Sequence, residues 1–283
     1  MMFERAAVLG VGLIGASLAL SMKQRSLVGH VVGHGRTEAN LRRARERGII
    51  DSYELEASRA CEDADLVVYA TPVGSFRQIA ESIQSSLKEG AIAIDVGSVK
   101  GSLVQDIEKL TPQGANFVAC HPIAGSESSG IDAASGHLFE GRLCIICRTE
   151  RTDPKAFDRV SGLWGAIGSR VEVMEPRTHD AVFGLVSHLP HVAAYALVNT
   201  VADIDPGSLD YAGNGFRDTT RIAASPPAIW RDICAFNRDN LLKYLDVFKN
   251  NIEALSALLK EGDLDGLEAA FRRASERRRG LED

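Results

Sequence analysis

The stretch Ala6-Ala7-Val8-Leu9-Gly10-Val11-Gly12-Leu13-Ile14-Gly15-Ala16-Ser17-Leu18-Ala19 decides how this chain folds. A short apolar run ends at Gly10 and a helical pattern begins after Gly12, which predicts a strand, a tight turn and a helix N-terminus. Gly10 permits the turn, Gly12 leaves room for a pyrophosphate, and Gly15 lets the helix pack close to the strand. An ordinary glycine turn is the alternative, but the position between strand and helix favours a phosphate-binding turn. The predicted cofactor-binding residues here are Gly10, Gly12, Leu13, Ile14 and Gly15.

Composition narrows the class of protein. The chain has 283 residues, 45% of them hydrophobic, and a net charge of −6, so a sizeable core is expected and non-specific nucleic-acid binding is not. Its five cysteines are scattered and odd in number, which suits a reducing cytoplasm. Cys144 and Cys147 have the spacing of a metal knuckle but lack a second pair, so no metal site is predicted. No signal peptide is expected, and no apolar run reads as long enough to span a membrane.

Strands and helices alternate over the first part of the chain. Further strands are predicted at 30–34, 65–70, 91–96, 117–120, 143–147 and 170–174, with helical segments between most of them. This alternation predicts an α/β fold with a doubly wound parallel sheet of the Rossmann type over residues 1–175. Thr71, Ser98 and His121 each follow a predicted strand end, where ligands of such sheets bind, so we expect them to share one crevice.

Strand signals disappear after Pro176. Helices are predicted at 178–201, with a kink at Pro190, then at 228–260 and 264–279, and residues 211–217 read as a glycine-rich loop. Residues 176–283 are therefore predicted to form a separate all-helical domain. An apolar stripe on the long helix predicts packing against a partner subunit, and hence a homodimer; its members are Leu245, Phe248, Ile252, Leu255 and Leu259.

The end of the second strand bears on cofactor choice. In dinucleotide-binding domains an acidic residue about 20 positions beyond the glycines bonds the ribose hydroxyls of NAD. This chain has Gly35 there, followed by Arg36 and Thr37, a fork of donors and a hydroxyl that suit a 2′-phosphate. We therefore predict NADP; the alternative is that Arg36 is a solvated surface residue and NAD is bound less specifically.

Several polar side chains could carry chemistry. A neutral His121 beyond a strand end could accept a proton from a substrate hydroxyl, although a hydrogen-bonded structural histidine is an equal alternative. His188 and His191 have the spacing of metal ligands on one helix face, but no matching third ligand follows, so a helix kink or an anion contact is favoured. Arg221 lies among small residues and suits a carboxylate, a surface salt bridge being its alternative.

Four motifs and the glycine turn together resemble the prephenate/arogenate (cyclohexadienyl) dehydrogenase family of tyrosine biosynthesis. The motifs are Gly12-Leu-Ile-Gly-Ala-Ser-Leu-Ala19, His121-Pro-Ile-Ala-Gly-Ser-Glu127, Ser187-His-Leu-Pro-His191 and Gly215-Phe-Arg-Asp-Thr-Thr-Arg-Ile-Ala223. They occur in the family's order and approximate spacing over nearly the whole chain. The resemblance implies a Rossmann domain followed by a helical dimerisation domain.

The resemblance also implies roles for matching residues. His121 matches the catalytic histidine and Ser98 a serine that orients the substrate hydroxyl and the nicotinamide. Arg221 matches the arginine that grips a substrate carboxylate. Glu127 matches a gating acid, and His188, His191 and Trp230 match residues on the substrate side of the pocket. Gly35 departs from the acidic residue of NAD-using members.

The function implied is oxidative decarboxylation of prephenate or arogenate with hydride transfer to NADP. Two alternatives stay open. One is another reductase with a Rossmann and a helical domain, of the β-hydroxyacid dehydrogenase or imine reductase type. The other is a non-catalytic NADP sensor, which would need the glycine turn but not His121, Ser98 and Arg221.

Overall fold

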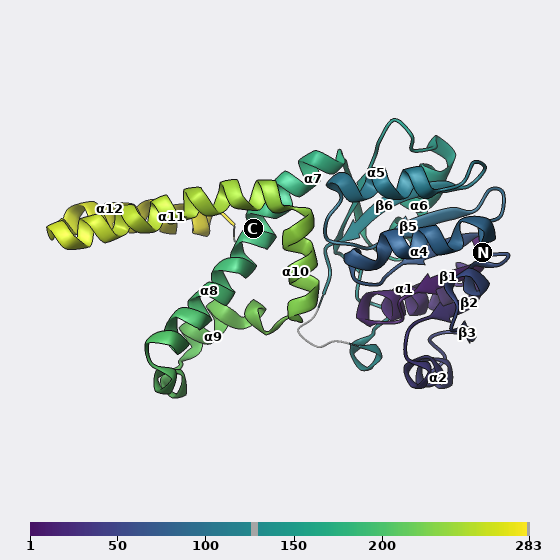
Figure 1. Cartoon of the computed structure of the whole chain (residues 1–283), viewed down its shortest axis with the longest axis horizontal. Coiled ribbons are helices and arrows are strands. Elements are labelled where there is room, and N and C mark those ends of the chain that lie inside the picture. Colours follow the sequence, from purple (N-terminus) through teal and green to yellow (C-terminus); the bar gives the residue numbers. More distant parts are fainter. Residues whose placement is uncertain (126–129, 282–283) are drawn as a thin grey trace. The chain divides into compact units, whose positions relative to one another are not determined.

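A computed structural model of the chain describes residues 1–125 and 130–281 and contains one eight-stranded sheet (Figure 1). The strand order is β3-β2-β1-β4-β5-β6-β7-β8. The chain adds strands on one side of β1 as far as β3 and then continues on the other side with β4. The boundary between β1 and β4 is therefore the switch point at which such sheets bind ligands. The strands are β1 (Phe3–Leu9), β2 (Val28–His34), β3 (Ser52–Glu54), β4 (Leu66–Tyr69), β5 (Ile92–Asp95), β6 (Asn116–Pro122), β7 (Leu143–Cys147) and β8 (Arg170–Met174).

Helices cover both faces of the sheet because successive residues of its central strands are buried on opposite sides. On β1, Ala6 and Val8 join one hydrophobic core, whereas Ala7 and Leu9 join the other. The first core is closed by α1 (Leu13–Gln24), α2 (Glu38–Glu46) and α6 (Pro154–Ala166). The second is closed by α3 (Ala57–Cys61), α4 (Phe76–Ile83) and α5 (Gly101–Leu110). The predicted α/β Rossmann fold is confirmed.

The far edge of the sheet departs from the predicted parallel order. β7 pairs with β6 in the antiparallel sense, with His121 opposite Ile145, and β8 returns parallel to β7. In the described part of the connection between β6 and β7, the only helix assigned is a short 3-10 helix, Ile131–Ala133, so the α-helical crossover that joins parallel strands is not seen there. The antiparallel pairing still leaves His121 near the carboxyl end of β6.

Helices follow the sheet from Pro176 onward. A nearly continuous helical run consists of α7 (Pro176–Phe183), a π-helical turn (Gly184–His188) and α8 (Leu189–Ile204). The π-helical turn ends two residues before Pro190, a residue that cannot donate a helical hydrogen bond. A short α9 (Asn214–Thr220) and α10 (Pro227–Phe236) then follow.

Two helix predictions are wrong in detail. Most of the predicted loop 211–217 belongs to α9, which contains a single glycine, Gly215, at its second position, where one glycine costs only about 1 kcal/mol. The long helix predicted over 228–260 is divided at Asn237, which has φ −108° and ψ 29°, into α10 and α11 (Arg238–Glu261). Helix α12 (Leu264–Arg279) occupies the predicted range.

The chain forms two compact units, Met1–Asn237 and Arg238–Asp283. The first contains the whole sheet together with α7 to α10, because Phe183 and Ile233 join the second core of the sheet. The second consists of α11 and α12, which pack against each other. The predicted boundary between 175 and 176 stays a prediction.

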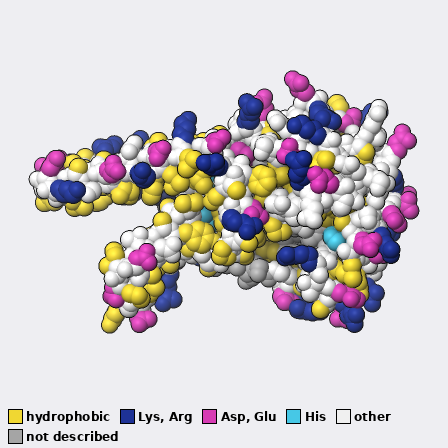
Figure 2. All heavy atoms as spheres, viewed as in Figure 1, with side chains coloured by type: hydrophobic (Ala, Val, Ile, Leu, Met, Phe, Trp, Pro, Cys, Tyr) yellow, Lys and Arg dark blue, Asp and Glu magenta, His cyan; other side chains and the backbone are white. Residues whose placement is uncertain are grey.

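Apolar side chains are exposed on both helical segments. Figure 2 shows apolar side chains gathered on α8 and on the helices of the second unit. The exposed apolar residues of these helices include Leu197, Ile204, Val247 and Ile252. The run Pro176–Ile204 is long and apolar enough to cross a membrane by length and composition, with 22% of its most apolar window buried. The prediction that no apolar run reaches this length is therefore wrong, because the helical run continues through Pro190.

Candidate functional site

The glycine turn brings β1, α1 and the end of β4 into close contact. Gly10 has φ +109°, and a Cβ on it would lie 2.6 Å from the Ala70 backbone carbon. A Cβ on Gly15 would lie 2.2 Å from the Gly10 carbonyl oxygen, so helix and turn touch directly. Nothing lies within 4 Å of a Cβ built on Gly12, which leaves the space that a pyrophosphate needs.

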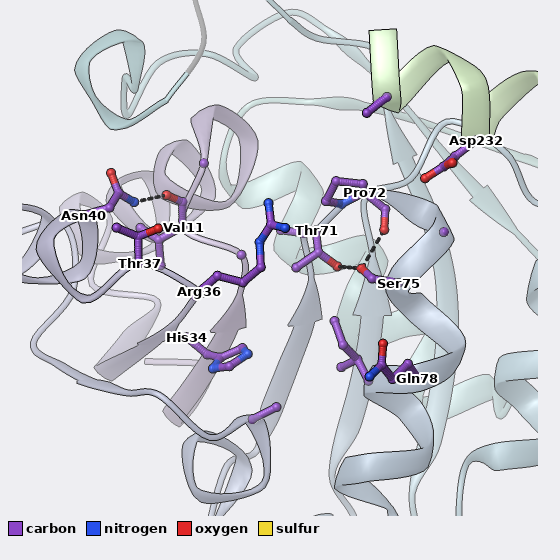
Figure 3. Close-up of a pocket in the computed structure, with 18 of the residues that line it drawn as sticks. Val11, His34, Arg36, Thr37, Asn40, Thr71, Pro72, Ser75, Gln78 and Asp232 are labelled. Carbon is purple, nitrogen blue, oxygen red and sulfur yellow. Dashed lines mark hydrogen bonds between the residues drawn. The ribbon is translucent and has the colours of Figure 1, made fainter. Parts of the chain in front are cut away.

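A cavity of about 890 Å³ opens in front of this turn (Figure 3). Arg36 extends from the end of β2 toward the space between Val11 and Thr71, and His34 lies beside it. Gly10, Gly12, Thr37 and Thr71 also line the cavity, whereas Leu13, Ile14 and Gly15, on the first turn of α1, are not among its lining residues. The cavity therefore has open space for a pyrophosphate, the N-terminus of a helix and a positively charged side chain. These three features together fit a bound dinucleotide.

Two polar contacts that sequence reasoning missed shape this cavity. The Asn40 amide donates to the Val11 carbonyl oxygen at 3.0 Å and so fixes the glycine turn. The Ser75 hydroxyl donates to Thr71 Oγ1 at 2.7 Å and fixes the loop after β4. Both contacts join residues of ordinary type, and the sequence carries no signal that singles them out. On the helical side, Asp232 of α10 reaches the same cavity near Gly74.

Ser98 lies on a loop that closes around a buried ion pair. The Lys100 ammonium donates to Asp95 Oδ2 at 2.6 Å and to the Gly97 carbonyl oxygen at 2.7 Å, with both charged side chains almost fully buried. Asp95 also accepts the backbone N–H groups of Gly97 and Cys120. One carboxylate thus ties the loop after β5 to β6, the strand that carries His121.

His121 is buried, with 8% of its surface exposed. Its Nδ1 lies 2.8 Å from Nε2 of His179 on α7, and the Phe183 ring packs against both imidazoles. Burial lowers the pKa of His121 well below its usual range, and the nearby Lys100 charge lowers it further. The imidazole is therefore neutral at physiological pH, the state in which it can accept a proton. Sequence reasoning missed His179.

The predicted substrate-side residues come from four consecutive elements: His188 ends the π-helical turn, His191 lies on α8, Arg221 begins a 3-10 helix and Trp230 lies on α10. The imidazole of His191 stacks on the Trp230 ring with 3.4 Å between centroids, and His188 meets the edge of the same ring. The positive charge of Arg221 is close enough to contribute to the lowered pKa of His191, whose main cause is burial. The Arg221 charge, the imidazoles of His188 and His191 and the Trp230 indole therefore lie close together.

His188 is completely buried and is oriented by Asn237. The Asn237 amide donates to His188 Nδ1 at 3.0 Å, so the ring proton is on Nε2. Among the residues described, Nε2 has no hydrogen-bond partner of ordinary geometry, although the Ser98 backbone lies near enough to act on the imidazole. Burial lowers the pKa of His188 to about 4. A buried N–H group without a partner is costly, and this one lies next to the Ser98 loop.

Two further predictions about this site concern Glu127 and a metal ion. Glu127 lies outside the described residues. Within 1–125 and 130–281, no group of three or more His, Cys, Asp or Glu side chains is arranged to hold a metal ion.

A glycine turn that opens on a large cavity at the switch point of a Rossmann sheet, with a neutral buried histidine near the carboxyl end of β6 in the same sheet, defines a nicotinamide-dependent dehydrogenase. Two family models agree with this class: the prephenate dehydrogenase nucleotide-binding domain matches residues 18–173, and the prephenate dehydrogenase dimerization domain matches residues 175–273. The chain belongs to the prephenate dehydrogenase family.

Individual relatives support this assignment over the whole length of the chain. The cyclohexadienyl dehydrogenase of Zymomonas mobilis is 33% identical over 99% of this chain and 96% of its own. The crystal structure of Aquifex aeolicus prephenate dehydrogenase, in complex with hydroxyphenyl propionate and NAD+, is 35% identical with a TM-score of 0.93 and covers 99% of this chain and 98% of its own. The Synechocystis arogenate dehydrogenase structure is 27% identical with a TM-score of 0.80, covering 98% and 99%.

Proposed function

We propose that this chain catalyses the oxidative decarboxylation of prephenate, arogenate or both, with hydride transfer to a nicotinamide cofactor. The observation that carries the proposal is His121. Its Nδ1 is engaged by His179, so Nε2 is the ring nitrogen left to face a substrate, and burial keeps the imidazole neutral. The bound nicotinamide would supply the hydride acceptor.

The reaction requires little of the protein beyond orientation and a base. His121 takes the proton of the C4 hydroxyl while the hydride leaves C4. The bond between the ring and its carboxylate breaks, carbon dioxide leaves, and the bonding electron pair completes the aromatic ring. His121 then returns its proton to the ring oxygen. The product is 4-hydroxyphenylpyruvate from prephenate or tyrosine from arogenate. Aromatisation supplies the driving force, so positioning is the main contribution of the protein.

The substitution His121→Asn tests this function. It keeps the size and polarity of the side chain but removes the base, so kcat should fall by a factor on the order of a hundred or more while substrate binding stays close to normal. Steady-state kinetics with both substrates and both cofactors measure this. A variant with near wild-type kcat would overturn the role of His121, and a wild-type protein that binds NADP without turnover would favour the sensor.

The second part of the proposal concerns the cofactor. NADP is supported by the Arg36 guanidinium directed into the cavity and by Gly35, where a carboxylate would repel a 2′-phosphate. A charge-assisted contact contributes about 1.5–3 kcal/mol, so kcat/KM should favour NADP over NAD at least about tenfold.

Two substitutions separate the contributions to this preference. A Cβ on Gly35 would lie 3.5 Å from the Leu41 side chain, an ordinary contact, so Gly35→Asp fits and should move the preference toward NAD. Arg36→Ala should weaken NADP binding and leave NAD binding nearly unchanged. Equal losses for the two cofactors would mean that Arg36 packs on the adenine ring instead.

The remaining parts of the proposal concern assembly and location. A dimerisation domain together with exposed apolar side chains on α8 and α11 supports a homodimer. The scattered cysteines, each unpaired in the described chain, support a place in the reducing cytoplasm.

A further inference from the structure

Three buried side chains from two distant parts of the sequence form a line that ends at His121. His179 and Asp180 come from α7, 58 residues beyond His121. The Asp180 carboxylate lies 2.8 Å from His179 Nδ1, and His179 Nε2 lies 2.8 Å from His121 Nδ1. The three residues are exposed by 4%, 0% and 8%, in the order Asp180, His179, His121. Water therefore does not compete for these hydrogen bonds.

The carboxylate determines where each proton lies. An ionised carboxylate only accepts hydrogen bonds, so His179 Nδ1 must donate to Asp180. A neutral His179 then has a lone pair on Nε2 and accepts from His121. His121 consequently carries its proton on Nδ1 and keeps a free lone pair on Nε2. This is the tautomer that a base acting through Nε2 requires.

The surroundings hold the acidic end of the line in place. The backbone N–H of Lys100 donates to Asp180 Oδ1 at 2.8 Å, and the Asn237 amide donates to the Asp180 carbonyl oxygen at 2.8 Å. The Phe183 ring covers the two imidazoles. The charged and titratable groups that act on the line, within the described part of the chain, are the Lys100–Asp95 ion pair on the loop after β5 and His188 on the π-helical turn.

We propose that His179 and Asp180 are positioning residues of the proposed reaction, which hold His121 with Nε2 toward the substrate and stabilise the imidazolium that forms when it takes the hydroxyl proton. This inference rests on the proposed function. Through the step His121 keeps its Nδ1 proton bonded to His179, and the Asp180 carboxylate compensates the new positive charge through the intervening ring. The arrangement has the logic of an aspartate that orients a histidine base, with one further histidine between them.

Three variants test this line of hydrogen bonds by removing a charge, conserving an acceptor or removing an acceptor. Asp180→Asn keeps an acceptor oxygen for His179 and removes the negative charge. His179→Gln keeps an amide oxygen that can accept from His121 Nδ1, whereas His179→Ala removes the acceptor. His30→Gln is the matched control, because His30 bonds to Ser52 on the β2–β3 edge, away from the line. Each variant is measured for kcat, for KM of prephenate and arogenate, and for the pH profile of kcat/KM.

The expected results differ from those of a merely structural role. Asp180→Asn should lower kcat about 10- to 100-fold with KM within about twofold. Removal of the anion lowers the pKa of the histidine pair, so the acid limb of kcat/KM should move to lower pH. His179→Gln should retain more activity than His179→Ala. Unchanged kcat in Asp180→Asn and His179→Ala, or equal loss in both His179 variants with an unmoved acid limb, would overturn the proposal.

A spectroscopic measurement keeps the inference independent of turnover and of variant folding. Nitrogen-15 NMR of wild-type protein labelled at histidine should show His121 with a protonated Nδ1 and an unprotonated Nε2 at pH 7, assigned by the loss of its signals in His121→Asn. The opposite tautomer would overturn the positioning role even if turnover is normal. The expected tautomer in a protein that turns over neither substrate would refute the proposed function and leave the hydrogen-bond line in place.

Discussion

Arg221 is the side chain on which recognition of the substrate's negative charge is expected to depend. It begins a short 3-10 helix, Arg221–Ala224, and acts electrostatically on His191. If its guanidinium holds a substrate carboxylate equally in the ground and transition states, Arg221→Ala should raise KM for prephenate at least about tenfold and change kcat much less. Steady-state kinetics at saturating cofactor measure this split.

Arg217 provides the matched control for that substitution. It belongs to the same segment, and its Nε donates to the Ala212 carbonyl oxygen, so Arg217→Ala removes a nearby positive charge without touching Arg221. We expect its KM to remain within about twofold of wild type. An unchanged KM in Arg221→Ala with a raised KM in Arg217→Ala would assign the carboxylate to Arg217.

Among single residues, the sequence allowed the prediction of those that have a chemically active side chain or a glycine at the end of a predicted strand. The glycine turn could be predicted because it lies at a fixed place in a βα unit, and His121 because it lies near the carboxyl end of a strand of the sheet. His179 and Asp180 were missed because their role depends on a contact across 58 residues, and adjacent His and Asp are an ordinary pair on a helix. The role of Asn237 was not predictable for another reason: it lies inside the single long helix predicted over 228–260.

Among the elements, the loop between β5 and α5 depends on one buried charge pair. Lys100 and Asp95 are exposed by 0% and 1%, so removal of one partner leaves the other charge without compensation. Lys100→Met should therefore lower the free energy of unfolding by about 3–5 kcal/mol. Urea unfolding followed by circular dichroism measures the change, and the loss of Ser98 positioning should lower activity as well.

The exposed pair Lys88–Asp65 is the control for the buried one. Its ammonium and carboxylate lie 2.7 Å apart, but the two side chains are exposed by 40% and 20%, so solvent competes for the contact. Lys88→Met should cost less than about 1 kcal/mol. Similar losses for the two variants would mean that burial does not strengthen the dependence of Asp95 on its partner.

The elements themselves were predicted well where periodicity and punctuation agree. Strands β1, β2 and β4 to β8 and helix α12 lie close to their predicted ranges, because apolar runs end at turn residues. The direction of β7 was not predictable, since apolar spacing is the same in parallel and antiparallel strands. Helix α9 was not predicted because Gly213 and Gly215 at its start are typical of a loop. Strand β3 was not predicted because it is only three residues long.

For the whole molecule, the exposed apolar stripe on α11 leads to the last prediction. Phe248, Ile252 and Leu259 remain exposed by 37%, 52% and 63% even though α12 packs beside the helix. Contiguous apolar surface of this kind marks an interaction face, and the match to a dimerization domain covers it. Light scattering should give about twice the chain mass at micromolar concentration, because identical chains bury such faces symmetrically.

Charge placed on the stripe should separate the two chains. Phe248→Glu combined with Ile252→Glu would bury two uncompensated carboxylates in the interface, a cost of several kcal/mol that shifts the protein toward monomer. Lys249→Glu, an exposed change between them, should leave the mass unchanged.

Because Pro176–Ile204 also has the length and composition of a membrane span, flotation with liposomes completes the comparison. A monomeric wild-type protein that floats with the vesicles would contradict dimerisation and assign the exposed apolar face of α8 to lipid.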